Sequence, residues 1–192
     1  MAYKLKTAPA AEPVSSTEAK AHLRVDHTDD DTLIGTLIIT ARRFCEEYLN
    51  QSLITQTWYN YLNDFYDGAI YYVYRGPFLM INKGPVQSIT SIKYYDADDV
   101  EQTLSTDYYH TDLSSQPARI EVSETPETYD KLNAVTIEFV AGYGDAADVP
   151  EHIKHAMLLY IGHLYENRGD EGHRTPPRAF YDILNQNRIK TF

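Results

Sequence analysis

The chain has 192 residues, enough for one sizeable hydrophobic core or two small ones, and its 43% hydrophobic content excludes an intrinsically disordered protein. Its 28 acids and 17 bases give a formal net charge of −11, which excludes general coating of nucleic acid by the outer surface, because such binders need positive charge. No apolar run approaches the ~20 residues of a membrane span, and the first residues do not resemble a signal peptide. The single cysteine excludes an internal disulfide framework. We therefore expect a soluble protein of a reducing compartment.

Two helices are predicted near the amino terminus, after an extended arm over residues 1–14. Ser15 or Ser16 can cap the first helix, with Glu18 as the acid of its first turn. Asp29, Asp30 and Asp31 then stand where a second helix should start, as capping and first-turn acids. Apolar residues recur with helical spacing from Leu33 and predict that this helix ends near Asn50.

The periodicity changes from residue 53 onward. Short stretches rich in β-branched and aromatic residues, separated by glycine, proline and acidic turns, predict an antiparallel β unit over residues 53–142. A helix beginning at Pro150 and running to Arg168 follows, and then a short helix over 177–187. We therefore predict an α+β fold, a single domain over 1–192 with a helical body (15–50 and 149–187), the inserted β unit, and extended arms at 1–14 and 188–192.

No catalytic, metal or cofactor site is predicted. His152, His155, His163 and Glu166 share one helix face, but His155 and His163 lie about 12 Å apart along the axis, too far for one metal ion. Cys45 falls on an apolar helix stripe and is expected in the core. The acids Asp96, Asp98 and Asp99 lack the pattern of a calcium loop and indicate a hairpin turn. No nucleophile or phosphate-loop motif occurs, so we expect no enzyme.

Two features of composition suggest protein interfaces. Tyrosine makes up 17 of the 192 residues, and its apolar body with a polar tip suits both sheet surfaces and interfaces. The segment from Arg168 to Phe192 contains five basic and three acidic residues, so a basic tail follows an acidic body. A solvated tail and an ordinary β-rich preference for tyrosine remain the simpler interpretations of these features.

Two blocks of sequence resemble one known family, the head–tail connector (adaptor, head-completion) proteins of long-tailed bacteriophages and prophages. The first block, residues 12–58, contains EPVSS, KAHLRV, DDDTLI and QTW; the second, residues 141–169, contains GYG, VPEHIKHAMLL and HLYENR. Their order on either side of the β unit is that of the family. The long tyrosine-rich β unit and the carboxyl terminus depart from the family pattern.

The resemblance implies a structural virion protein. It would form a homo-oligomeric ring, dodecameric in the virion, beneath the portal protein, join capsid to tail through a tail or stopper protein, and extend a channel through which DNA passes without specific binding. The protein would be made in the bacterial host cytoplasm and would bind neither cofactor nor membrane. We expect Arg178, Arg188, Lys190 and Phe192 to contact the portal, and Asp29, Asp30, Asp31, Glu46 and Glu47 to line the channel.

Another class of function stays open at this point. A tail-associated accessory or carbohydrate-binding protein would use tyrosines on a β surface, since sugar-binding faces are also aromatic. Glycan binding by the isolated chain would favour that alternative, and rings formed alone or on added portal would favour the connector.

Overall fold

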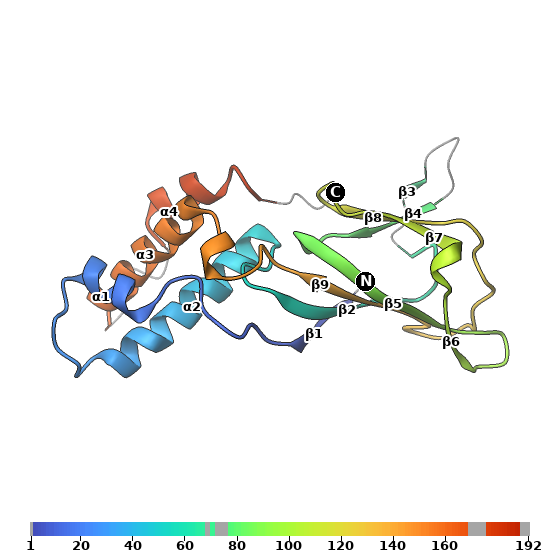
Figure 1. Ribbon diagram of the computed structural model, residues 1–192, viewed down its shortest axis with the longest axis horizontal. Coiled ribbons are helices and arrows are strands. Elements are labelled where there is room, and N and C mark those ends of the chain that lie inside the picture. Colours follow the sequence, from blue (N-terminus) through green and yellow to red (C-terminus); the bar gives the residue numbers. More distant parts are fainter. Residues whose placement is uncertain (1, 68–69, 72–76, 169–175, 189–192) are drawn as a thin grey trace. The chain divides into compact units, whose positions relative to one another are not determined.

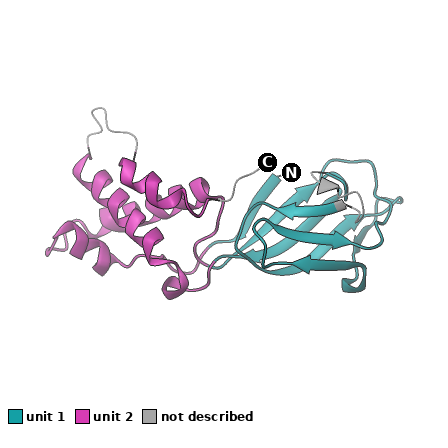
Figure 2. Ribbon diagram, turned by 90° about the horizontal axis from the view of Figure 1, so that it is seen from above, with its two compact units in different colours: residues 1–8, 55–142, 191 teal, residues 9–54, 143–190, 192 magenta. Residues whose placement is uncertain are grey.

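The computed structural model describes residues 2–67, 70–71, 77–168 and 176–188. The chain divides into two compact units, coloured separately in Figure 2. The helical unit comprises residues 9–54, 143–190 and 192, and the β unit comprises residues 1–8, 55–142 and 191. The predicted α+β class is confirmed.

The helical unit is built from α1 (Ser16–Leu23), α2 (Asp31–Leu49), α3 (Glu151–Glu166) and α4 (Arg178–Leu184), with the 3₁₀ turn η2 (Ala146–Asp148) before α3 (Figure 1). The predicted cap of α1 is present, because the Ser15 hydroxyl accepts a hydrogen bond from the Glu18 amide while the Glu18 carboxylate accepts one from the Ser15 amide. Asn50 ends α2 in the left-handed conformation, which asparagine tolerates better than most residues. The first predicted helix pair is therefore confirmed.

Aromatic and aliphatic side chains from three helices fill the core of this unit. Cys45 of α2 and Met157 and Ile161 of α3 are fully buried, as is Phe180 of α4. The Phe44 ring lies 5.6 Å from the Phe180 ring, which fastens the short α4 to α2. The prediction that Cys45 belongs to the core is confirmed.

The β unit contains two antiparallel sheets. The strands are β1 (Ala2–Thr7), β2 (Gln56–Leu62), β3 (Ile70–Tyr71), β4 (Pro77–Ile81), β5 (Val86–Tyr95), β6 (Glu101–Thr103), β7 (Tyr109–Asp112), β8 (Ala118–Val122) and β9 (Val135–Ala141), with the 3₁₀ turn η1 (Thr106–Tyr108) before β7. Their order is β1-β2-β9-β5-β6 in one sheet and β3-β4-β8-β7 in the other. The predicted hairpin turn at Asp96, Asp98 and Asp99 joins β5 to β6.

One hydrophobic core lies between the inner faces of both sheets. Alternate residues of β9 are buried, from Val135 to Ala141, and the same holds for Ala118, Ile120 and Val122 of β8. This period of two is the pattern of sheets with one face in the core and one face in solvent.

The predicted amino-terminal arm needs correction. Residues 2–7 are not an isolated arm but strand β1, which pairs with β2 and places Tyr3 edge-on against Phe139 in the core. The sequence AYKLKT lacks a clear apolar alternation because β1 is a sheet edge and only Tyr3 among its residues is half-buried. Of the predicted arm at 188–192, all but Arg188 lies outside the described residues.

Candidate functional site

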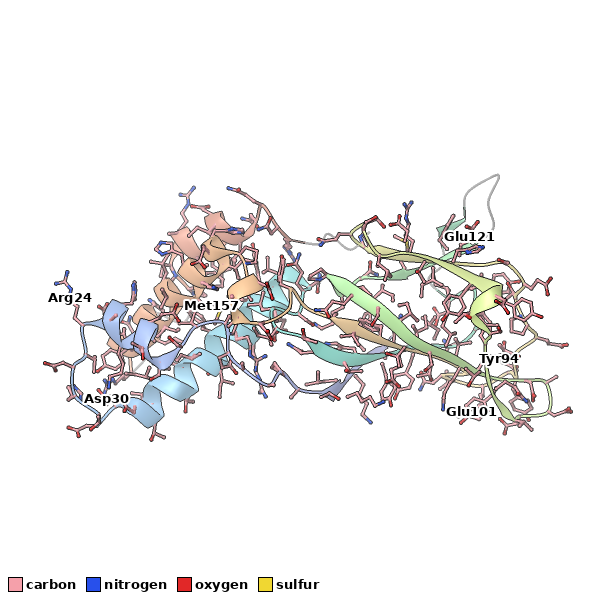
Figure 3. The ribbon with its side chains drawn as sticks, viewed as in Figure 1. Arg24, Asp30, Tyr94, Glu101, Glu121 and Met157 are labelled. Carbon is pink, nitrogen blue, oxygen red and sulfur yellow. The ribbon has the colours of Figure 1, made fainter. Side chains whose placement is uncertain are left out.

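Two of the three acids at the start of α2 have hydrogen-bond or ion-pair partners within the chain. Asp30 occupies the N-cap position but does not cap the helix, because its carboxylate accepts hydrogen bonds from the Tyr165 hydroxyl and from Arg168 at 2.8 Å. Asp31 pairs with Lys20 at 2.6 Å, and Asp29 is exposed (Figure 3 labels Asp30). The Tyr165 hydroxyl, and then Arg168, holds the pKa of Asp30 below its usual range. Asp30 therefore does not cap α2 as expected, and its hydrogen bonds connect the start of α2 to the end of α3 instead.

The two acids near the end of α2 lie in different environments. Glu46 is buried, accepts hydrogen bonds from Arg42 at 2.6 Å and from the Leu53 amide at 3.0 Å, and so presents no charge at the surface. Glu47 follows it 100° around the helix and is exposed. The prediction that Glu46 lines a channel is therefore corrected, whereas Asp29, Asp30, Asp31 and Glu47 stay as predictions.

A buried charge cluster forms around Arg42, which is 6% exposed. Its guanidinium group contacts Glu46 on the same helix and Glu12, at 2.7 Å, in the segment that precedes α1. Since each partly buried charge has an opposite charge within hydrogen-bond distance, the cluster is satisfied internally. Sequence analysis missed Arg42, because an arginine within a helix of mixed character usually indicates an exposed face.

The carboxyl-terminal residues predicted to contact a portal are positioned as follows. The side chain of Arg178, at the start of α4, is 94% exposed and lies 3.6 Å from Asp182. The guanidinium group of Arg188 lies over the Tyr48 ring, 4.9 Å from its centroid. Lys190 and Phe192 lie outside the described residues.

A hydrogen-bonded chain fixes the segment that leads to Arg188. The Gln51 side-chain amide donates to the Asn187 carbonyl at 2.8 Å and accepts from the Tyr143 hydroxyl at 2.8 Å. Tyr48 donates to the Asn185 side chain at 2.6 Å. Gln51 is 1% exposed, so these bonds are sheltered from water. No sequence pattern singled out Gln51 or Tyr143, whose partners are distant in the chain.

The histidine, cysteine and acidic residues considered from sequence do not come together in one described site. Among the described residues no group of three or more histidine, cysteine, aspartate and glutamate side chains could hold a metal ion. His152 contacts Asn187, and His163 stacks on Tyr160. Burial raises the pKa of the Cys45 thiol well above its usual range, which makes it a poor nucleophile. None of the described helices is long and apolar enough to span a membrane.

A shallow depression of about 180 Å³ lies on the outer face of the second sheet. Its lining residues are Phe78, His110, Thr111, Asp112, Arg119 and Glu121. Asp112 accepts hydrogen bonds from Arg119 and from Ser114, which hold the pKa of Asp112 well below its usual range. A carboxylate that stays ionised in a salt bridge with arginine can stabilise the structure but has no proton to donate as a general acid.

Tyrosines and lysines alternate on the outer face of the first sheet. The rings of Tyr59 and Tyr61 lie 5.9 Å apart, and the Lys6 ammonium lies 5.2 Å from the Tyr59 centroid. Lys6 also pairs with Glu138 at 2.7 Å. Lys6 and Glu138 therefore offset each other's charge on this face.

The amino-terminal part of the chain is similar to a known family. Residues 17–89, which run from α1 into β5, match the model of the family described as phage gp6-like head-tail connector protein. Over these residues the chain is similar to head-tail connector proteins. The resemblance predicted from residues 12–58 and 141–169 is confirmed for the first of these blocks by the match. No protein of curated function matches the sequence.

Solved structures extend the likeness in fold to the whole chain. A chain in the neck of an empty GTA particle computed with C6 symmetry is 20% identical, with a TM-score of 0.79. Chains in the virion of a native gene transfer agent particle and in the neck of a native GTA particle computed with C12 symmetry give TM-scores of 0.82 and 0.71, at 20% and 21% identity. Each comparison covers 100% of this chain and 97% of the other. At such identities the likeness shows a shared fold.

Proposed function

We propose that the protein is a structural subunit of a ring at the head–tail junction of a phage-like particle, and not an enzyme. The observation that carries the proposal is the connector-family match over 17–89 together with a fold shared over the full length with chains from particle necks. The C6 and C12 symmetries with which those necks were computed are those of closed rings and support a ring, which we take as dodecameric. The ring would lie beneath the portal and carry the tail or a stopper protein.

The acidic character of the chain suits a DNA channel. With a net charge of −11, a wall of exposed carboxylates would repel phosphate instead of binding it, so DNA could slide past. Asp29 and Glu47 are the best candidates for that wall, because both are exposed and neither forms an ion pair with another described residue. Asp30 and Asp31 would contribute less, since Arg168 and Lys20 offset their charges.

The carboxyl-terminal segment is the proposed portal-binding element. Arg178 and Arg188 offer positive charge, and the bonds of Asn185 and Asn187 to the helical unit give the segment a fixed starting point. Lys190 and Phe192 would complete the contact. A rigid base of this kind reduces the conformational entropy lost when the terminal residues bind.

The proposal is tested by assembly. The full chain is mixed with purified portal from the same genome, and rings on the portal are counted by negative-stain microscopy and native mass spectrometry. Deleting the residues after Asn187, which keeps the bond from Gln51 to the Asn187 carbonyl, should abolish portal binding while the thermal melting temperature changes little. Unchanged binding would show that the terminus is not the portal contact. Absence of the full chain from mature particles would overturn the connector function itself.

The channel assignment has its own test. The charge reversals Asp29→Lys and Glu47→Lys should slow DNA ejection or retain DNA in the particle, because positive charge in the wall would bind phosphate. Glu124→Lys is a matched reversal on an exposed acid of the β unit. Normal ejection by the first two variants would contradict the assignment. Failure of the isolated chain to bind glycans would remove the carbohydrate-binding alternative.

A further inference from the structure

Three large apolar side chains are exposed at one end of the β unit. Leu132 is 80% exposed, Val100 52% and Tyr129 41%; we call these three residues the tip patch. Single exposed apolar side chains are ordinary, but Leu132 is the most exposed large hydrophobic residue among those the structure describes. An apolar group of this kind usually marks a place where another molecule binds.

Two loops carry the tip patch: the turn over residues 96–100 between β5 and β6, with Val100, and the segment over residues 123–134 between β8 and β9, with Tyr129 and Leu132. Hydrogen bonds join the second loop to the end of β5, where the first loop begins. The Tyr129 amide donates to the Tyr95 carbonyl at 3.0 Å, and the Tyr95 amide donates to the Ala134 carbonyl at 3.0 Å. The Lys131 ammonium lies 3.1 Å from the centroid of the Tyr95 ring and also pairs with Asp99. Figure 3 labels the neighbouring Tyr94 of β5 and Glu101 of β6 at this end of the unit. The two loops therefore form one surface.

The turn that presents Val100 is fixed as well. The Asp96 carboxylate accepts hydrogen bonds from the Val100 amide at 3.0 Å and from the Gln102 side chain at 2.7 Å. The Gln102 bond, and then the backbone bond, lowers the pKa of Asp96 and keeps it ionised. A surface organised before binding loses little conformational entropy when a partner docks.

Negative charge surrounds the tip patch. The carboxylates on the first loop, on β6 and between Tyr129 and Leu132 are Asp96, Asp98, Asp99, Glu101 and Asp130, and the nearby bases are Lys93 and Lys131. Lys93 pairs with Glu101 and Lys131 with Asp99, so both bases are already engaged. Asp98 and Asp130 are exposed and form no ion pair with another described residue. The rim thus carries three more negative than positive charges.

We propose that the tip patch is a docking surface for a different protein, one that presents an apolar pocket with a basic rim. The rim charge favours this occupant by electrostatic complementarity, which guides association and orients the partner. Nucleic acid is disfavoured because phosphates would meet carboxylates. A second copy that docks through the same patch is disfavoured because two rims, each with three more negative than positive charges, would face each other. The inference rests on the proposed function only in that the connector must meet a second protein besides the portal.

Photo-crosslinking tests the occupant directly. The full chain is produced in cells that make the particles, with p-benzoylphenylalanine in place of Leu132, and adducts are identified by mass spectrometry. The matched control carries the same probe in place of Leu5, which is 39% exposed on β1 of the same unit. We expect the Leu132 probe to capture a different protein through a peptide rich in lysine or arginine, and the Leu5 probe not to capture it. An adduct with a second copy, an adduct with nucleic acid, or no adduct overturns the proposal.

Charge reversal tests the rim. Asp98→Lys combined with Asp130→Lys should lower the yield of that adduct at least tenfold, whereas Asp26→Lys, at an exposed acid between α1 and α2, should leave it unchanged. Equal yields in both variants, at equal thermal stability, would overturn the complementarity argument. Presence of the chain in purified particles tests the proposed function separately; if it is absent there, the adduct recovered from whole cells still decides the tip patch.

Discussion

Buried polar side chains have hydrogen-bond partners in the helical unit, whereas one in the β unit has none among the described residues. In the helical unit Arg42 has both Glu12 and Glu46 as partners, and Gln51 is bonded to Tyr143 and Asn187. In the β unit Asn60 is fully buried on β2, opposite Tyr3 and Ile137, and neither polar atom of its side chain has a partner within the described part of the chain. A satisfied buried polar group can fix the position of a segment, whereas an unsatisfied one costs stability.

The difference indicates what each polar group does. Arg42 and Gln51 connect α2 to segments distant in sequence, namely the segment before α1 and the segment after α4. The segment after α4 leads to the proposed portal contact, and the segment before α1 leads to β1. Within the described residues the Asn60 side chain makes no hydrogen bond, and the β unit is held together by its apolar core. The following variants test this comparison.

Arg42→Ala should have the largest effect. It leaves Glu46 buried without its cation, and breaking a buried ion pair in this way costs about 3–5 kcal/mol. The free energy of unfolding, measured by urea denaturation, should fall by that amount. Arg43→Ala, at an exposed neighbouring position, is the control and should change it by less than about 0.5 kcal/mol. Similar losses in both variants would show that the Arg42 cluster has no special role.

Asn60→Val should act in the opposite direction. The substitution removes the unsatisfied amide from the core and places a β-branched residue in a strand, so we expect stabilisation of about 1–3 kcal/mol. Urea denaturation of the full chain gives the change, and Asn63→Val, at an exposed position after β2, controls for the substitution itself. Destabilisation by Asn60→Val would show that its amide is satisfied in solution.

Ser15→Ala should have an intermediate effect in the helical unit. It removes the capping hydroxyl of α1, and loss of such a cap costs about 1 kcal/mol. Hydrogen exchange should become faster in α1 peptides, while β-unit peptides such as 135–141 should be unaffected. Ser16→Ala, one residue inside the helix, provides the comparison. Faster exchange in both units would contradict a local role.

Asp30→Asn should have the smallest effect and should depend on pH. The pKa of Asp30 is lowered in the folded state, so the folded chain binds fewer protons there than the unfolded chain, and its contribution is present above an unfolded pKa of about 4. That contribution is lost as pH falls through the folded pKa. The melting temperature of the wild type should therefore fall more steeply below pH 4 than that of the variant. Asp29→Asn should behave like the wild type.

Local pattern was enough to predict much of the fold. The caps and apolar spacing of α1 and α2 depend on residues three or four positions apart, so they are visible in sequence. The turn between β5 and β6 is encoded in the same local way by Asp96 and its neighbours. Strand β1 was missed because its place is set by pairing with β2, more than fifty residues away.

The candidate site was less accessible from sequence. Asp29, Asp30, Asp31, Glu46 and Glu47 look equivalent as carboxylates, yet Glu46 is buried and Asp30 is bonded to Tyr165 and Arg168. The tip patch brings together Val100 and Tyr129, which no sequence pattern connects. Partners that lie so far apart in the chain carry no local signal.

The sequence by itself determined the charge, the helix and strand periods, and the family blocks, because composition and short-range spacing express them directly. Only the tertiary structure decided which acids are neutralised, that residues 2–7 join a sheet, and where apolar side chains stay exposed. Folding brings distant side chains together, and a charge or an apolar group acquires its role from those neighbours. The net charge of −11 therefore describes the whole chain, while the described contacts decide where that charge is available.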